Sequence, residues 1–224
     1  ADGQFGNELT AGWLRGELKK AGGRDIQINL NSPGGSPFEA ASMMDVLRSY
    51  EGRKVIKIVS LAASAASRFC CAADEVIATS NSAHLRHCAS GGTWGNSADH
   101  QRTLEILRGI DKQMAADYSK WSGKSVEQEL SEMEGEAWTW GEEIFLSGYA
   151  TSFEEVEQKQ DPAVAMADAR SRFAAAFRAP TESEVAAYLG SSSPDDRIKR
   201  LRSWTEADPG HIELQALVEQ AIRT

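Results

Sequence analysis

The sequence is poor in cysteine, and this shortage excludes two classes of protein. Only three cysteines occur among 224 residues: Cys70, Cys71 and Cys88. Their number is odd and no pair has the CxxC spacing, which argues against a disulfide framework and against a structural zinc site. We therefore expect a protein that needs no metal or other cofactor and resides in a reducing cytoplasm.

Long apolar runs and concentrated positive charge are also missing. Every apolar stretch is interrupted by charge well before the roughly 18 residues that a membrane span needs, and the chain does not open on a signal-like segment. Lysine and arginine total 24 against 33 acidic residues, a net charge of -9. Because no basic cluster offsets this charge, we expect neither nucleic acid nor membrane as a partner. The composition predicts a soluble, non-exported protein that acts on a protein or peptide.

Strand and helix patterns alternate in the first part of the chain. Residues 7–20 have the spacing of a helix, residues 25–31 alternate as a half-buried strand, and Ser36 caps a helix that runs to about residue 50. Residues 55–61 form a second β-rich run. The order strand, helix, strand predicts a parallel crossover in an α/β fold, with site loops at the carboxyl ends of the strands.

The small apolar run 62–73 predicts a helix buried on every side, with Ser64 in its first turn. A long amphipathic helix is expected over residues 98–121. The remaining elements that we predict are strands at 75–79 and 83–87 and helices at 126–133 and 141–146.

The composition changes after about residue 153, where acidic residues and glutamine fill residues 154–161. An alanine-rich helical pattern covers residues 163–177, and prolines at positions 180 and 194 break the segment that follows. Two further helix starts are expected there, Thr181 with Glu184 and Ser193 with Pro194. We predict a main domain of residues 1–157 and a small helical C-terminal appendage of residues 158–224, whose role the sequence does not indicate.

The motif NSPGG at residues 31–35 and the later Ser64 look like two halves of an acyl-transfer site. The glycines let a substrate approach backbone N–H groups, and small residues flank the Ser64 hydroxyl in AASAAS. A serine after a strand and at the start of a helix has the position of a nucleophile elbow, although AASAA replaces the GxSxG form. The N–H groups of Gly35 and Ala65 would then form an oxyanion hole.

A catalytic serine needs a base, and the chain has four histidines: His84, His87, His100 and His211. His100 opens the long helix and His211 lies in the appendage, so both are expected to be solvated. His84 and His87 are three residues apart and point to opposite faces of an extended segment, so only one of them would face the site. Spacing alone does not choose between them.

The frame INLNSPGG, AASAAS, NSAHLRH and EAWTWGEEIFLSGYA resembles the Clp protease proteolytic-subunit family, especially its phage-borne relatives that act as head-maturation proteases. The resemblance covers about residues 9–155. It implies Ser64 as nucleophile, His87 as base and Glu136 as the third member of a triad. It also implies a crotonase-like architecture of stacked βαβ units with a handle-type helix, and a ring-shaped homo-oligomer.

Three features depart from the family pattern. Glu136 stands where Asp is the more familiar residue, and Leu85 and Arg86 precede the histidine where the family prefers apolar residues. The strand expected ahead of the first helix is missing, which indicates a trimmed or shortened start. Three nearby acids are rivals of Glu136: Glu134, Glu142 and Glu143.

The leading hypothesis is a serine endopeptidase that works through an acyl-enzyme and processes capsid or scaffold proteins during phage head assembly, or degrades peptides in an oligomeric chamber, in the host cytoplasm if phage-encoded. A Ser-Lys peptidase would instead use Lys54 or Lys57 as base. An acyl-CoA enzyme would share the oxyanion donors without needing Ser64. A catalytically silent assembly protein would use the long helix, Trp138 and Trp140 as oligomer contacts.

Overall fold

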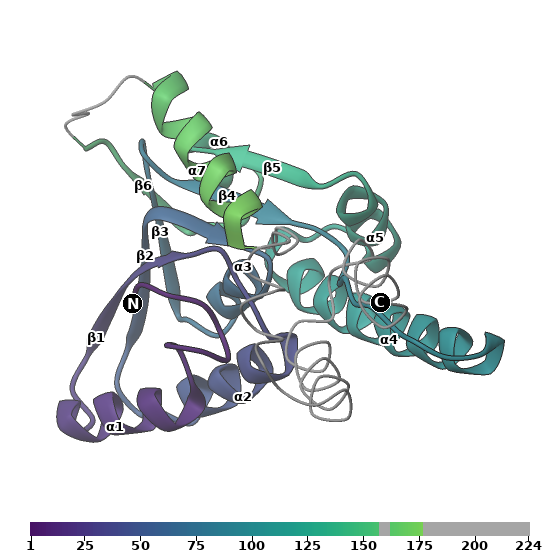
Figure 1. The fold of residues 1–224 in the computed structure, drawn as a ribbon. Helices are drawn as coiled ribbons and strands as arrows, with labels where there is room; N and C mark the ends of the chain where they lie inside the picture. The colour runs from purple at the N-terminus through teal and green to yellow at the C-terminus, as the bar shows by residue number, and fades with distance from the viewer. Residues whose placement is uncertain (157–161, 177–224) are drawn as a thin grey trace, which may run out of the picture. The chain divides into compact units, whose positions relative to one another are not determined.

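The computed structural model describes residues 1–156 and 162–176. One compact unit comprises residues 1–88 and 110–173, and residues 89–109 belong to a second. The first unit contains the whole β-sheet and every described residue of the predicted site (Figure 1). The second unit contributes a loop and the first half of the long helix.

A curled six-stranded sheet forms the centre of the first unit. Its longest strand, β2, pairs with β1 along one edge and with β3 and then β4 along the other. β6 extends the sheet beyond β3, and β5 pairs with β4 in the one antiparallel contact of these six strands. The strands are β1 (Ile26–Ser32), β2 (Lys54–Ala63), β3 (Glu75–Thr79), β4 (Ala83–Arg86), β5 (Ala137–Trp140) and β6 (Ser152–Glu154).

Local signals in the sequence set the ends of several helices. Ser36 accepts a hydrogen bond from Glu39 N at the start of α2, with Pro37 in the first turn, as predicted. Gly22 ends α1 in the left-handed conformation. The described helices are α1 (Ala11–Ala21), α2 (Pro37–Arg48), α3 (Ala65–Cys70), α4 (Ser97–Ser122), α5 (Val126–Glu134), α6 (Glu142–Leu146) and α7 (Pro162–Ala176).

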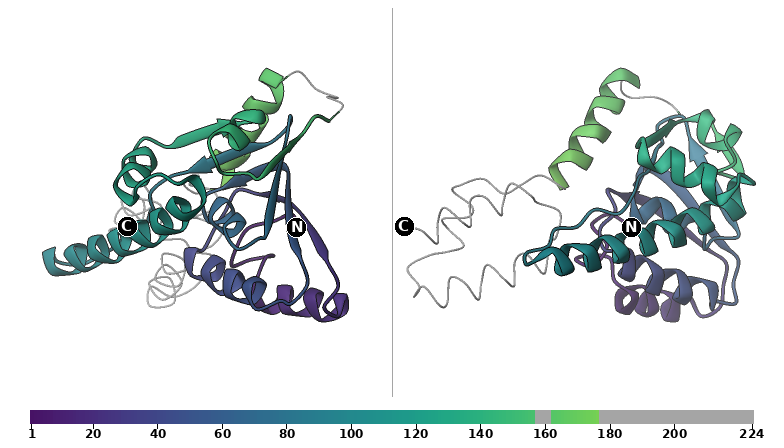
Figure 2. Two further views of the ribbon diagram at one scale, coloured as in Figure 1. Left: turned by 180° about the vertical axis from the view of Figure 1, so that it is seen from behind. Right: turned by 90° about the vertical axis from the view of Figure 1, so that its right-hand side faces the viewer.

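Apolar side chains fill two regions around β2. Ile56 and Ile58 are fully buried, as is Leu47 of α2. Further along β2, Leu61 and Ala63 belong to a separate cluster that includes Ala169 of α7. The cluster also includes Ala83 and Leu85 of β4, across which α7 runs in Figure 1. Figure 2 shows the same ribbon from behind and from the side.

The predicted α/β class is confirmed, and so is the strand-helix-strand unit, because β1, α2 and β2 follow one another and the two strands are parallel. The helix predicted over residues 62–73 was wrong at its start. Strand pairing with β4 carries β2 on to Ala63, so Ser64 stands between strand and helix instead of inside the first helical turn.

One other prediction needs correction, and two strands were not anticipated. The first helix begins at Ala11, because Thr10 caps it and the preceding residues bond to the NSPGG loop instead. β5 and β6 were not predicted. In place of the missing first strand, isolated parallel bridges join Asp2 to Asn31 and Phe5 to Gly35. The appendage is described only in α7, so the helix starts predicted at Thr181 and Ser193 lie outside the described residues.

Candidate active site

Ser64 occupies a strained turn between β2 and α3. Its φ of 57° and ψ of -125° lie in a region that residues with a side chain rarely adopt. Such a conformation costs on the order of 1–3 kcal/mol and persists only where the surroundings enforce it. Here the Ser64 N–H donates to Leu85 O of β4 at 2.9 Å. The turn has the strand-to-helix form of a nucleophile elbow.

Buried hydroxyl groups hold the carbonyl side of the same residue. Ser67 Oγ donates to Ser64 O at 2.6 Å, and the backbone N–H groups of Ser67 and Arg68 donate to the same oxygen. Tyr118 of α4 contacts Ser67 Oγ at 2.7 Å and Ser64 O at 3.4 Å. The second half of α4 therefore helps to fix the nucleophile turn.

Gly34 lies directly against Ser64. A Cβ atom on Gly34 would come within 2.6 Å of Ser64 Cβ and of Ala63 O, and within 3.0 Å of Ala65 N. The φ of Gly34 is 105°, which also favours glycine. The NSPGG loop and the AASAAS turn are thus brought into contact, as the acyl-transfer hypothesis requires.

Gly35 is turned toward the N-terminal segment. Its φ is 134°, and a Cβ atom there would lie 2.3 Å from Phe5 O. Phe5 N donates to Gly34 O and Ser36 N donates to Phe5 O, so the segment runs alongside the loop. Sequence reasoning singled out Gly35 as a donor but missed that Gly34 is the glycine packed on the serine.

His87 and His84 face opposite sides of β4. His84 is 1% exposed and stacks on Tyr149, with ring centroids 5.3 Å apart. Burial, aided by the charge of Arg86, lowers the pKa of His84 to about 3. His87 lies on the side of Leu85 and contacts Phe173 of α7. The structure therefore assigns His84 to the core and leaves the half-buried His87 as the candidate base.

Two acids influence His87. Burial lowers the pKa of His87, while the charges of Glu136 and then Asp111 oppose the shift. The imidazole is therefore neutral at neutral pH, as a general base must be. Glu136 has a positive φ of 53°, and its N–H donates to Met133 O. Glu136 as a whole is an exposed residue.

Asp111 of α4 was missed in the sequence. It also raises the pKa of the neighbouring Cys88 thiol, although burial is the main reason why that pKa reaches about 11. Its signal was an acid one position after Ile110, at the edge of the apolar stripe of α4. The rivals Glu142 and Glu143 lie exposed on α6, and Glu134 contributes to the shift of Cys88.

The lysines proposed as alternative bases lie far from Ser64. Lys54 pairs with Asp74 at 3.0 Å, and Lys57 pairs with Glu154. Lys57 precedes Ser64 by seven residues, mostly in an extended strand, which separates them by roughly 20 Å. This arrangement argues against the Ser-Lys hypothesis.

Three further observations concern the remaining histidines, metal ligands and membrane crossing. His100 is exposed at the start of α4, and His211 lies outside the described residues. Within residues 1–156 and 162–176, no three His, Cys, Asp or Glu side chains gather as a metal site would need. No described helix combines the length and the apolar character that crossing a bilayer requires.

Helix α7 packs beside the candidate site. Arg172 donates to Asn31 Oδ1 of the NSPGG motif at 2.7 Å and to Ser60 Oγ of β2 at 3.3 Å. The Phe173 ring meets the His87 imidazole edge-on, with centroids 5.4 Å apart, and Trp138 in the same manner at 5.8 Å. A segment of the predicted appendage therefore contacts both the NSPGG motif and the candidate base.

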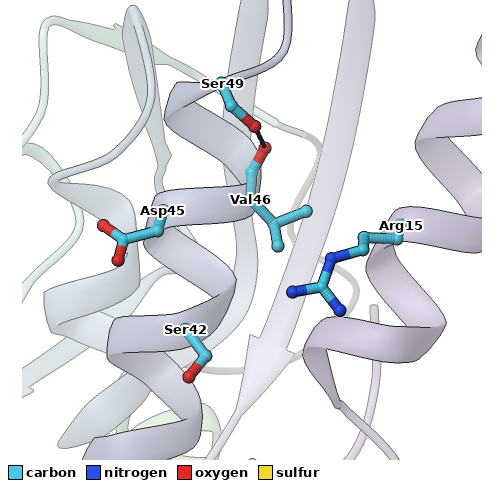
Figure 3. A pocket seen from close by; sticks show the side chains of 5 residues that line it. All are labelled: Arg15, Ser42, Asp45, Val46 and Ser49. Atoms are coloured by element: carbon cyan, nitrogen blue, oxygen red, sulfur yellow. Dashed lines mark hydrogen bonds between the residues drawn. The ribbon is translucent and has the colours of Figure 1, made fainter.

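An open pocket lies elsewhere, between α1 and α2 (Figure 3). Arg15 of α1 extends toward Val46 of α2, whose carbonyl accepts a hydrogen bond from Ser49 Oγ at 2.8 Å. Ser42 and Asp45 complete the lining. The pocket contains none of the predicted site residues.

Comparison with known protein families shows to which family the chain belongs. The family model for Clp protease matches residues 15–152, which is more than half of the chain. The chain belongs to the Clp protease family. The predicted membership is thereby confirmed, whereas the phage head-maturation subtype stays a prediction.

Two curated proteins illustrate how similar the chain is to other Clp protease subunits. The ATP-dependent Clp protease proteolytic subunit of Porphyromonas gingivalis is 33% identical over 141 residues, which are 61% of this chain and 63% of that protein. The ATP-dependent Clp protease proteolytic subunit 1 of Leifsonia xyli subsp. xyli is 25% identical over 134 residues, 59% of this chain and 68% of that protein. The chain thus spans less than two thirds of the length of the first relative.

The region matched by the Clp protease model includes the strands and loops that carry Ser64, His87 and Glu136. Helix α7 begins at Pro162, beyond the last matched residue. Its contacts with His87 and Asn31 are therefore an addition of this chain to the matched Clp protease region.

Proposed function

We propose that the chain is a serine endopeptidase. Ser64 Oγ attacks the peptide carbonyl carbon while His87 takes the hydroxyl proton, and Glu136 orients the imidazole. The N–H groups of Gly35 and Ala65 stabilise the oxyanion. His87 then returns the proton to the departing amine, which leaves an acyl-enzyme on Ser64. Water, deprotonated by His87, hydrolyses this ester and restores the serine.

The observation that carries the proposal is the enforced conformation of Ser64. A strained φ is held by hydrogen bonds to β4 on one side and to Ser67 on the other, and the bare α-carbon of Gly34 leaves room in front of it. An ordinary packing serine needs none of these features. Membership in the Clp protease family and the neutral His87 beside two acids support the same conclusion.

The test is covalent labelling with a fluorophosphonate, read by intact mass, together with cleavage of a peptide library. We expect one label per chain on the wild-type protein, and loss of labelling and of cleavage in Ser64→Ala. Ser42→Ala is the matched control, because Ser42 lines the pocket between α1 and α2 and donates to Phe38 O of its own helix. It should label at the wild-type rate.

The pH dependence of labelling adds a second readout. An ordinary histidine has a pKa near 6.5, and burial lowers that of His87. The base therefore stays neutral as the pH falls to 6.5, and the labelling rate should decline only below that value. His87→Ala should lower the rate on the order of 100-fold or more. Unchanged labelling and cleavage in Ser64→Ala would exclude the peptidase and favour a catalytically silent assembly protein.

The substrates that we propose are proteins or peptides in the cytoplasm, cleaved within a ring-shaped homo-oligomer. Capsid or scaffold proteins of a phage head are the narrower proposal, supported by the resemblance of the four sequence motifs to phage-borne relatives. Incubation with the candidate scaffold protein and mass analysis of the products would test it. Cleavage of general peptides alone would favour the degradative role.

A further inference from the structure

A buried ion pair lies one residue away from the candidate base. Arg86, the last residue of β4, is 1% exposed, and Glu129 of α5 is fully buried. Arg86 Nη1 donates to Glu129 Oε2, and Nη2 donates to Glu132 Oε2 at 2.8 Å. The planar guanidinium thus joins β4 to two successive turns of α5.

Aromatic and hydroxyl groups enclose this pair. Tyr149 OH donates to Glu129 Oε1 at 2.8 Å, and Ser122 Oγ at the end of α4 donates to the same oxygen. The Arg86 guanidinium lies 3.8 Å from the centre of the Tyr149 ring. Such a site is specific in its geometry, because each buried charge needs its partners in place.

Helix α5 ends next to the candidate base and the candidate acid. Met133, in the last turn of α5, accepts hydrogen bonds through its carbonyl from Cys88 N at 3.3 Å and from Glu136 N at 3.2 Å. One carbonyl group therefore connects the residue after His87 with the predicted third member of the triad. Anything that fixes α5 against β4 also fixes the distance between these two segments.

The alternation of side chains along β4 links Arg86 to the direction of His87. Successive side chains of a strand point to opposite faces, and a slip of one residue exchanges the faces. His84 and Arg86 both contact Tyr149 on one face, whereas Leu85 belongs to the cluster that contains Ala169 on the other. In the register that buries Arg86 against Tyr149, Leu85 and His87 both lie on the face toward Ala169, and a slip of one residue would turn both to the opposite face.

We propose that the Arg86–Glu129 pair is a positioning device for the catalytic base. It sets the register of β4 and the place of α5, and thereby aligns His87 and Glu136 with Ser64. The proposal rests on the proposed peptidase function for its kinetic consequences. Neither Arg86 nor Glu129 touches the reacting atoms, so both are positioning residues. A buried ion pair is weak support for stability, and in some proteins it instead fixes the register of the packed elements.

The test replaces both charges by apolar side chains in Arg86→Met/Glu129→Leu. Apolar replacement of a complete buried pair generally preserves folding, whereas Arg86→Met alone leaves an unpaired buried carboxylate and should lower the melting temperature markedly. We expect the folded double variant to lose kcat on the order of 10-fold to 100-fold with KM unchanged. The single variant Arg86→Lys keeps the positive charge but not the planar guanidinium that binds two partners. Its kcat should fall less than that of the double variant.

A matched control separates positioning from general loss of stability. Leu47→Ala removes a fully buried side chain from α2 and creates a cavity, so it also lowers the melting temperature. Below its melting temperature this variant should retain the wild-type kcat and pH profile. The double variant should instead shift the acid limb of the labelling profile, because the imidazole changes its distance from Glu136.

Histidine-selective NMR gives a readout that does not depend on activity. In a Ser64→Ala background, the His87 imidazole signals and their titration should change when Arg86→Met/Glu129→Leu is added. The positioning role would be overturned if the folded double variant kept the wild-type kcat, pH profile and His87 signals. If Ser64→Ala still labels and cleaves, the peptidase proposal fails, and the NMR comparison alone still decides whether the pair positions His87.

Discussion

At the scale of single residues, two positive-φ side chains mark the candidate site. Ser64 and Glu136 are the described residues other than glycine with φ above zero. The backbone N–H groups of these two residues donate hydrogen bonds to Leu85 O and to Met133 O respectively. The family resemblance of the sequence predicts both residues as triad members, and the unusual φ at the same two positions supports that prediction.

Gly34→Ala should disturb the candidate site directly. The new Cβ would lie 2.6 Å from Ser64 Cβ at a φ of 105°, so the serine turn must move, at a cost on the order of 1–3 kcal/mol for the strain alone. We expect a large loss of fluorophosphonate labelling and a lower melting temperature, measured by intact mass and by calorimetry.

Gly16→Ala is the control for this substitution. Gly16 lies on the exposed face of α1, and no atom lies within 4 Å of the position that a Cβ would take there. Alanine should therefore stabilise the helix by about 0.5–1 kcal/mol and leave labelling unchanged. Equal labelling in Gly34→Ala and Gly16→Ala would show that Gly34 does not shape the site.

At the scale of secondary-structure elements, α7 is the element that the sequence placed least well in relation to the site. Its helical pattern was predicted, but its contacts were not. Ala169 is 3% exposed in the cluster with Leu61 and Leu85, and Arg170 lies over the stacked rings of Trp138 and Trp140. The two tryptophans thus pack against this chain's own helix.

Phe173→Ala should increase the reactivity of Ser64. The Phe173 ring contacts both His87 and Trp138, and an aromatic contact contributes about 1 kcal/mol, which corresponds to roughly fivefold in an equilibrium. Removing the ring favours states in which α7 has left the imidazole, so labelling should accelerate by a factor of that order. Ser171→Ala, at an exposed neighbouring position, should have no effect. A slower reaction in Phe173→Ala would contradict this expectation and indicate that α7 supports the site.

At the scale of the whole molecule, large apolar side chains remain exposed on separate elements of the first unit. Phe38 of α2 is 66% exposed and Leu146 of α6 is 73% exposed. Exposed apolar groups of this size are common at protein interfaces. They accord with the proposed homo-oligomer.

Sedimentation and native mass spectrometry should therefore detect an assembly whose mass is a multiple of the 24.3 kDa chain. Burial of apolar surface should make the assembly persist when the salt concentration is raised, because screening weakens charge contacts and not apolar ones. A single chain at micromolar concentration would contradict the oligomer and require the site to function without neighbours.

The elements with strong local signals could be predicted from the amino-acid sequence. The capped start of α2, the alternation in β1 and the small residues around Ser64 act within a few positions of one another. These signals were enough to place the NSPGG loop and Ser64 at the carboxyl ends of adjacent strands. The β5 and β6 strands have four and three residues, which is too short for a periodic pattern to emerge.

Long-range packing gives the two histidines of residues 84–87 different surroundings and brings Gly34 against Ser64. His84 and His87 are equivalent in spacing, and their difference arises from Tyr149 and from an ion pair between residues 43 positions apart. The contact of Gly34 with Ser64, the charge of Asp111 near His87 and the packing of α7 are likewise long-range. Such contacts depend on how strands and helices pack, and no local pattern in the sequence encodes them.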